Sequence, residues 1–162
     1  MLGCSGICYP SREEGTLDDS AAAAESLQPV HEADAWGKTL GLEVLEVTPE
    51  RVRARLQAAP RHHQPYGVLH GGVYCSIVEA VASYGAGTAA RSRGQKGVLG
   101  VSNQTDFLRS HSTGELICEG HPLHSGRSTH LWTVEITRVT DGKLVARGQV
   151  RFHVLQELPD ER

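Results

Sequence analysis

The chain has 162 residues, of which 39% are hydrophobic and 22% are charged. This length predicts one domain with a sizeable core. The net charge of −3 and the pI near 6.3 give no general electrostatic reason to expect binding to nucleic acid. No apolar run approaches the roughly 20 residues that a membrane span needs, so no membrane association is expected.

The four cysteines are Cys4, Cys8, Cys75 and Cys118. They make no disulfide framework, which favours a reducing compartment and predicts a cytoplasmic protein. Cys75 and Cys118 stand among apolar residues and are expected in the core. The Cys4-x3-Cys8 spacing lacks a second pair, and no acid or cysteine completes a ligand set with the histidines, so neither a metal nor a cofactor is predicted. No basic segment precedes an apolar stretch at the N-terminus, which argues against a signal peptide.

Composition divides the chain into three parts. Residues 1–28 are rich in Gly, Ser, Ala and acids, and are expected to form a polar, flexible tail. Residues 29–156 carry the periodic patterns of a folded domain, and residues 157–162 are expected to be a C-terminal tail.

The first part of the domain predicts one short helix and two strands. Apolar residues at gaps of three, three and four favour a helix over residues 30–40, although Gly37 weakens it. Residues 40–47 read as a strand, and a turn follows at 48–50. Residues 51–56 then alternate between Arg and apolar side chains, which is typical of an antiparallel strand with one exposed face.

The longest apolar segment, residues 73–90, is too long for a strand and predicts a helix buried over much of its surface. The patterns in the rest of the domain predict four strands, over residues 98–108, 115–123, 129–139 and 144–155. Thr140-Asp141-Gly142-Lys143 is a hairpin turn signal. One helix cannot separate two sheets, so the predicted α+β fold is a single antiparallel sheet curled around one long helix.

A polar, turn-forming segment, residues 62–72, leads into this helix and ends in His70-Gly71-Gly72. Glycines expose backbone N–H groups, and a helix N-terminus concentrates partial positive charge. Glu79 is a lone carboxylate on an otherwise apolar helix, where burial is costly without a partner or a function. Together these features indicate a site for negative charge that develops beside a carboxylate.

These residues give the chain its family resemblance. Gln64 precedes His70-Gly71-Gly72 by six residues, Glu79 follows His70 by nine, and Ser83 lies one helical turn further on. Residues 103–109 and 126–129 stand where characteristic strand segments are expected. Over about residues 40–155 the chain resembles the hotdog-fold acyl-CoA thioesterases, in the branch of the PaaI-type enzymes and the Arthrobacter-type 4-hydroxybenzoyl-CoA thioesterase.

The resemblance implies a role for each matching position. Glu79 matches the catalytic carboxylate, which acts as nucleophile or general base. Gly71 matches the residue whose backbone N–H polarises the thioester carbonyl, with Gln64 near that carbonyl and His70 shaping the loop. Ser83 would orient water or the carboxylate. The expected substrate-binding positions, near the carbonyl or coenzyme A, are Gly72, Arg109, Arg127 and Ser128. The expected partners are the acyl-CoA substrate and further copies of the chain, as a dimer with shared active sites or a dimer of dimers.

Helical geometry adds an independent expectation. Gly71 and Glu79 are eight residues apart, so on one helix they are separated by a rise of about 12 Å. That is too far for both to touch one carbonyl group. We therefore expect Gly71 of one subunit to face Glu79 of another, across a dimer interface.

Other interpretations remain open from the sequence alone. The protein could be a hotdog dehydratase or hydratase acting on an acyl thioester, or a non-catalytic acyl-CoA-binding domain. Glu79 could also be a structural ion-pair partner, His70 only a helix cap, Gln64 only a loop residue, Ser83 only helix filler, and the two arginines and Ser128 ordinary surface residues. The small residues of the helix, including Ala80, Gly85 and Gly87, suggest room for a bulky or aromatic acyl group.

Overall fold

The computed structural model describes residues 31–156, so the predicted tails and the N-terminal cysteines lie outside the described residues. The elements follow one another as α2 (Ala35–Leu40), β1 (Leu42–Val47), β2 (Val52–Ala58), the short 3₁₀ helix η1 (Pro60–His62), α3 (Gly71–Ser92), β3 (Gly97–Phe107), β4 (Gly114–Ser125), β5 (Thr129–Arg138) and β6 (Leu144–Leu155). The order of two strands, one long helix and four strands confirms the layout expected from the sequence.

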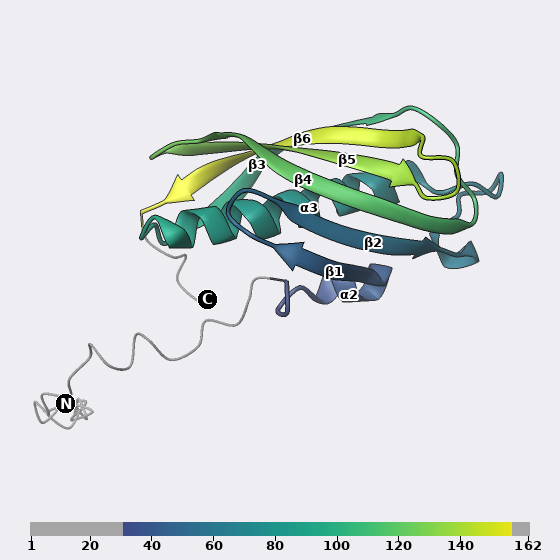
Figure 1. Cartoon of the computed structure of the whole chain (residues 1–162), viewed down its shortest axis with the longest axis horizontal. Helices are drawn as coiled ribbons and strands as arrows, with labels where there is room; N and C mark the ends of the chain where they lie inside the picture. The colour runs from purple at the N-terminus through teal and green to yellow at the C-terminus, as the bar shows by residue number, and fades with distance from the viewer. Residues whose placement is uncertain (1–30, 157–162) are drawn as a thin grey trace, which may run out of the picture.

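One antiparallel sheet of six strands, in the order β1-β2-β4-β5-β6-β3, makes up most of the domain. The long helix α3 lies along one face of this curved sheet, and α2 lies beside β1 (Figure 1). This is the hotdog arrangement that the sequence predicts. Within residues 31–156, the two edge strands of the sheet are β1 and β3.

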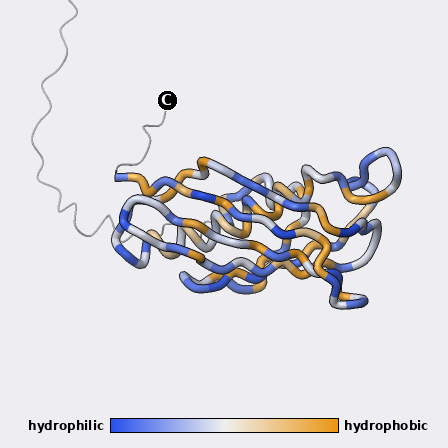
Figure 2. The backbone as a smooth tube through the Cα atoms, turned by 90° about the horizontal axis from the view of Figure 1, so that it is seen from above, coloured by the Kyte–Doolittle hydropathy of each residue, from blue (hydrophilic) through white to orange (hydrophobic). Residues whose placement is uncertain are grey.

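The core lies between α3 and the facing side of the sheet. Hydrophobic and hydrophilic residues alternate along the strands, as the tube in Figure 2 shows. Trp132, Val134 and Ile136 are fully buried on β5, as their shared face predicts. Gly85 of α3 sits directly on the indole of Trp132, where an added Cβ would lie 2.2 Å from a ring carbon. The small residues of α3 therefore bring the helix and the sheet close together.

Capping residues explain where the helices differ from the expected boundaries. Helix α3 begins at Gly71 rather than at residue 73, because the side chain of His70 accepts a hydrogen bond from the N–H of Gly72 and caps the helix. Among the described residues, α2 begins only after Asp34, which caps it in the same way. Gly41, at φ 76°, ends α2, so Leu40 belongs to that helix and not to the first strand.

The two cysteines of the described part differ in burial. Cys118 is fully buried in the core, as expected, but the expectation for Cys75 is wrong. Cys75 is half-buried on α3 and lines a pocket beside α2. Neither forms a disulfide. None of the helices within residues 31–156 is both long and apolar enough to cross a membrane.

Candidate active site

The loop before α3 is held in place by its backbone. The N–H of Leu69 donates to the carbonyl of His111 at 2.8 Å, and the N–H of His70 donates to the carbonyl of His62 at 2.9 Å. The ring Nδ1 of His70 then accepts from Gly72 at 2.9 Å. Because the first N–H groups of a helix have no intrahelical acceptor, the N–H of Gly71 is available to a ligand at the positive end of α3.

Gly71 also leaves open a space that any side chain at this position would fill. An added Cβ would lie 2.6 Å from the ring of Phe107, which is half-exposed on β3. Gly71 shares a pocket of about 350 Å³ with Gln64 and Arg109. The side-chain oxygen of Gln64 accepts from the N–H of Tyr66, which fixes the orientation of its amide. The structure thus brings three of the predicted site residues together.

Glu79 lies in the middle of α3, and its side chain is held by residues of α3 and β3. Its Oε2 accepts a hydrogen bond of 3.0 Å from the side-chain amide of Asn103 on β3. Its Oε1 lies 3.5 Å from the hydroxyl of Ser83, one turn along α3 as predicted. The same amide of Asn103 donates to the carbonyl of Cys75, and its oxygen accepts from Thr105 at 2.7 Å. These contacts orient the carboxylate, and an oriented carboxylate can act as a base or a nucleophile.

An irregularity in β3 makes this arrangement possible. The pairing of β3 with β6 shifts between Gly100 and Ser102, so Val101 is an extra residue and Gly100 and Asn103 oppose Phe152 and Val150. In a regular strand, residues three apart point to opposite faces. The bulge lets both Gly100 and Asn103 face Glu79, and a Cβ on Gly100 would lie 2.5 Å from Oε1 of that carboxylate.

Sequence reasoning missed Asn103 and Gly100 as site residues. Asn103 stands in a segment that the family resemblance includes, and a carboxamide inside a strand was the available signal. Nothing in the sequence marks Gly100 as a site residue, because only the bulge in β3 brings it next to Glu79.

The predicted site residues are distributed over several surfaces of the chain. Glu79 and Ser83 line a pocket of about 460 Å³ beside α2, whereas Gln64, Gly71 and Arg109 line the pocket at the start of α3. His70 and Gly72 line a third pocket, of about 590 Å³. Gly71 and Glu79 both belong to α3, which confirms the premise that about 12 Å of helical rise separates them.

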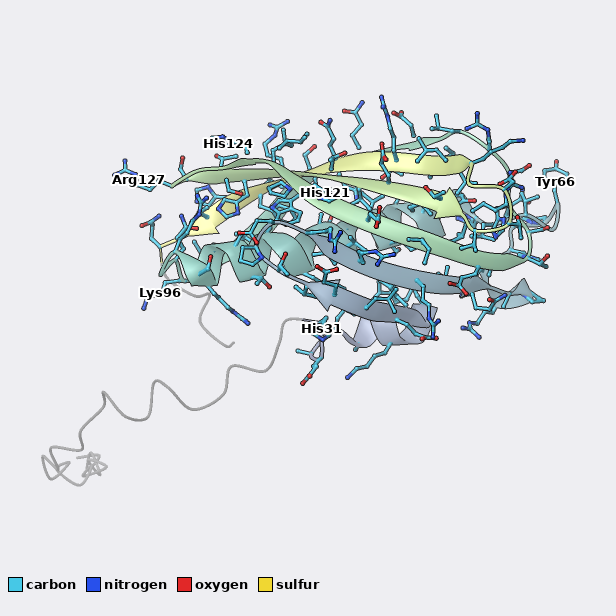
Figure 3. All side chains as sticks on the ribbon, viewed as in Figure 1. His31, Tyr66, Lys96, His121, His124 and Arg127 are labelled. Carbon is cyan, nitrogen blue, oxygen red and sulfur yellow. The ribbon has the colours of Figure 1, made fainter. Side chains whose placement is uncertain are left out.

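Arg127 and Ser128 lie in the turn between β4 and β5. Arg127 is at the opposite end of the domain from Tyr66, which stands two residues after Gln64 in the loop before α3 (Figure 3). Both residues are exposed, and their carbonyls accept from the side chain of Gln95 and the N–H of Val154. Arg109 is also anchored to backbone, since its guanidinium donates to the carbonyl of Leu144 at 2.6 Å. The structure of this chain does not bring Arg127 and Ser128 to the other site residues.

Helix α2 forms one wall of the pocket that contains Glu79. Oδ1 of Asp34 accepts from the N–H groups of Trp36 and Gly37 at 2.9 and 3.0 Å, and Oδ2 accepts from the hydroxyl of Tyr84 at 2.6 Å. Partial burial would raise the pKa of Asp34, but these hydrogen bonds outweigh it and lower the pKa. Asp34 is therefore ionised at neutral pH, and the pocket contains two carboxylates.

Neither a cysteine nucleophile nor a metal site is evident in the described part of the chain. Complete burial raises the pKa of the Cys118 thiol to about 12, so this cysteine is unsuited to nucleophilic catalysis. In residues 31–156 we find no group of three or more His, Cys, Asp or Glu side chains positioned to hold a metal ion.

Comparison with known proteins identifies the family. Residues 66–145 match the model of the thioesterase superfamily. The Mycobacterium tuberculosis protein named "Putative esterase Rv1847" is 43% identical over 136 residues, which cover 83% of this chain and 96% of that protein. Its solved structure superposes with a TM-score of 0.72 at 45% identity, over 76% of this chain and 98% of the other.

Two further relatives extend the comparison. The "1,4-dihydroxy-2-naphthoyl-CoA thioesterase 2" of Arabidopsis thaliana is 34% identical over 130 residues, which cover 76% of this chain and 81% of that protein. The structure of the E. coli PaaI protein shares the fold, with a TM-score of 0.69 at 20% identity over 77% of this chain and 87% of the other. Because a family model matches and relatives of 43% and 34% identity are named as an esterase and a thioesterase, this chain belongs to the thioesterase superfamily of hotdog-fold thioester hydrolases.

Proposed function

We propose that this protein hydrolyses an acyl-CoA thioester to the free acid and coenzyme A, with Glu79 as nucleophile or general base. The observation that carries the proposal is the position of the Glu79 carboxylate, held by Asn103 at 3.0 Å in a pocket beside α3. A simple binding domain has no evident use for a carboxylate oriented in this way, and the His70-Gly71-Gly72 segment followed by a helical Glu79 favours hydrolysis over hydration. Members of the hotdog thioesterase family act on acyl-CoA, which supports this substrate class.

The backbone N–H of Gly71 would polarise the thioester carbonyl, and His70 and Gln64 would shape the site around it. A preorganised donor at a developing oxyanion contributes about 3–4 kcal/mol to catalysis, judged from single donors removed in other enzymes. Since α3 places Gly71 and Glu79 about 12 Å apart along the helix, the pair that serves one substrate comes from two subunits. Arg109, Gly72, Arg127 and Ser128 remain the proposed contacts to substrate, the last two delivered by another subunit.

The free edge of β3 supports assembly of copies through this strand. In the sheet of residues 31–156, β3 pairs with β6 on one side only. It carries Leu99, Val101 and Phe107, which are each more than half-exposed. Long, apolar edge strands are normally covered. Pairing of two β3 strands would lengthen the sheet and bring two α3 helices near each other.

The free thiol of Cys118 supports a reducing, cytoplasmic setting.

Two variants test the reaction. Glu79→Gln keeps the size of the side chain and should lower the rate of thiol release by about 10²–10⁴-fold, as expected for loss of a general base. Glu135→Gln makes the same change at an exposed carboxylate on β5, away from Glu79, and is the matched control that should keep wild-type activity. A panel of acyl-CoAs and enoyl-CoAs, followed for free thiol and for hydration, separates hydrolysis from hydration and from binding alone. Unchanged hydrolysis by Glu79→Gln would refute the proposal.

Subunit mixing tests the shared site. Glu79→Gln and Gly71→Ala chains, each inactive alone, are unfolded together and refolded. If each site takes Gly71 from one subunit and Glu79 from the other, a mixed dimer has one intact site, and an equal mixture recovers about one quarter of wild-type activity. Recovery of no activity, with mixed dimers verified by differential tags, would place both residues of a site in one subunit.

A further inference from the structure

His62 is a buried titratable residue that the proposed reaction does not use. It is the last residue of η1, between β2 and the loop that leads to Gly71, and only 3% of it is exposed. Polar side chains buried this completely are normally hydrogen-bonded. Here both ring nitrogens and the backbone carbonyl have partners, and these partners come from three different segments of the chain.

The ring joins the end of β2 to the end of α2. Its Nδ1 lies 3.1 Å from the backbone nitrogen of Ala59, and its Nε2 lies 2.9 Å from the carbonyl oxygen of Leu40. A backbone N–H can only donate and a carbonyl can only accept, so these partners assign the proton to Nε2 and leave Nδ1 bare. The ring of His62 is therefore neutral and has one tautomer. It supplies a donor to a carbonyl at the C-terminal end of α2, where no partner exists within the helix.

The backbone of His62 holds the residue that precedes Gly71. Its carbonyl accepts from the N–H of His70 at 2.9 Å, and the ring of His70 accepts from the N–H of Gly72. Gly71 therefore lies between two anchored positions, of which the first depends on His62. A shift of His62 would move the N–H of Gly71 that is proposed to polarise the thioester carbonyl.

The surroundings of the ring favour its neutral form. Burial lowers the pKa of His62 below its usual value near 6.5; the bond to the Leu40 carbonyl opposes this, and the positive charges of Arg61 and His63 lower the pKa further. Nε of Arg61 is only 3.1 Å from Nε2 of the ring. A proton on Nδ1 would face the N–H of Ala59, so two donors would meet and this contact would have to open.

We propose that His62, in its neutral form, is a positioning residue for the oxyanion donor: its ring fixes the end of η1, and its carbonyl fixes His70 and with it the N–H of Gly71. The inference rests on the proposed thioesterase activity, because the role of Gly71 belongs to that proposal. It goes beyond that activity by making the donor depend on the protonation state of one buried ring. All of these contacts lie within one chain, so they do not depend on how copies of the chain assemble.

Steady-state kinetics with an acyl-CoA are the first arm of the test. His62→Ala removes both ring contacts and should lower kcat by about 10–100-fold, since a misplacement of about 1 Å can cost roughly 10²-fold in rate. KM should stay near its wild-type value, because an oxyanion donor acts in the transition state. His62→Asn keeps an acceptor for the N–H of Ala59 and should recover most of kcat. His121→Ala removes an exposed histidine of β4 and is the matched control that should keep wild-type kcat.

The pH profile is the second arm and separates positioning from general structural support. Only the wild type has a titrating ring at position 62, so the ratio of its kcat to that of His62→Asn cancels the groups that both proteins share. This ratio should follow the neutral fraction of the ring, which is measured from the ¹⁵N chemical shifts of His62 in the same buffers. It should be constant above about pH 6.5 and fall as the ring takes up a proton. A ratio that stays constant while the ring becomes protonated would overturn the inference.

Nuclear magnetic resonance is the third arm and does not need turnover. The N–H of His70 should exchange with solvent faster in His62→Ala than in the wild type, because its acceptor is no longer held. The N–H of Val134, in the middle of β5, should exchange at an unchanged rate. In the wild type at neutral pH, the ¹⁵N shifts should show a bare Nδ1 and a protonated Nε2. Unchanged exchange at His70, or a proton on Nδ1, would contradict the positioning role.

Failure of the thioesterase proposal gives a different result. If the wild type releases thiol from no acyl-CoA, that proposal fails, and the tautomer of His62 and the exchange at His70 still decide whether the ring holds this loop. If the wild type is active but His62→Ala keeps its kcat, or His62→Asn is as slow as His62→Ala, only the role of His62 is refuted.

Discussion

The side-chain amide of Asn103 lies on the inner face of β3 and donates to Oε2 of Glu79 at 3.0 Å. It reaches this position because the bulge at Val101 returns Asn103 to the same face as Gly100. Thr105 fixes which end of the amide faces Glu79, since its hydroxyl donates to the oxygen of Asn103 at 2.7 Å. Residues of the edge strand β3 and of the central helix α3 thus together orient the Glu79 carboxylate.

Removal of this amide should lower activity without unfolding the protein. Asn103→Ala leaves one oxygen of Glu79 without its donor and lets the carboxylate rotate, and a misplacement of about 1 Å can cost roughly 10²-fold in rate. The measurement is kcat for an acyl-CoA together with the circular dichroism spectrum. Wild-type kcat in Asn103→Ala would show that Glu79 needs no orienting partner.

The contact between Gly37 and Tyr84 should be visible in stability. Gly37→Ala places a Cβ 2.6 Å from the Tyr84 hydroxyl and 2.8 Å from the Asp34 carboxylate, so α2 must move away from α3. We expect a loss of about 1–3 kcal/mol in the free energy of unfolding, as for other overpacked sites. Urea unfolding measures it. Adding Tyr84→Phe removes the colliding hydroxyl, so the double variant should lose less than the sum of the two single changes.

Helix α3 should tolerate no side chain at position 85. A Cβ on Gly85 would lie 2.2 and 2.3 Å from two carbons of the buried Trp132 ring, and neither helix nor sheet can move freely. Gly85→Ala should therefore cost about 1–3 kcal/mol or more, despite the better helix propensity of alanine. Thermal and urea unfolding report the loss. If Trp132→Phe fails to relieve any of it in the double variant, the cost does not come from this ring.

His130 should make the protein less stable in mild acid. It is completely buried, and neither ring nitrogen makes a hydrogen bond of good geometry within residues 31–156. Burial lowers the pKa of His130 below its usual value near 6.5, and the charge of Arg93 lowers it further.

The sign of the pH effect follows from this direction. As pH falls below about 6.5, the unfolded chain takes up a proton at this histidine before the folded protein does. The contribution of neutral His130 is thus fully present above that pH and is lost as the pH falls toward the folded value. His130→Phe fills similar space without titrating, so its unfolding free energy should fall less between pH 7.5 and pH 5.5. An identical pH dependence in both proteins would contradict the prediction.

The sequence by itself determined the fold and its family. Alternation along the strands, the long apolar segment of α3 and the turn at residues 140–143 are local patterns, and a period of 2 or 3.6 residues can be read without knowledge of distant contacts. The motif from Gln64 to Glu79 is also local, and the helical rise between Gly71 and Glu79 follows from residue spacing alone.

Only the tertiary structure decided what surrounds Glu79. Asn103 and Gly100 meet the carboxylate because one extra residue in β3 changes which side chains point inward, and a bulge has no period that a sequence reveals. Trp36 reaches the same pocket because Asp34 bonds to Tyr84, which is 50 residues away in the chain. Likewise, Cys75 stands among apolar neighbours in sequence, yet in the fold it lines a pocket beside α2. Contacts between distant segments depend on how the elements pack, and this packing selects the partners of each site residue.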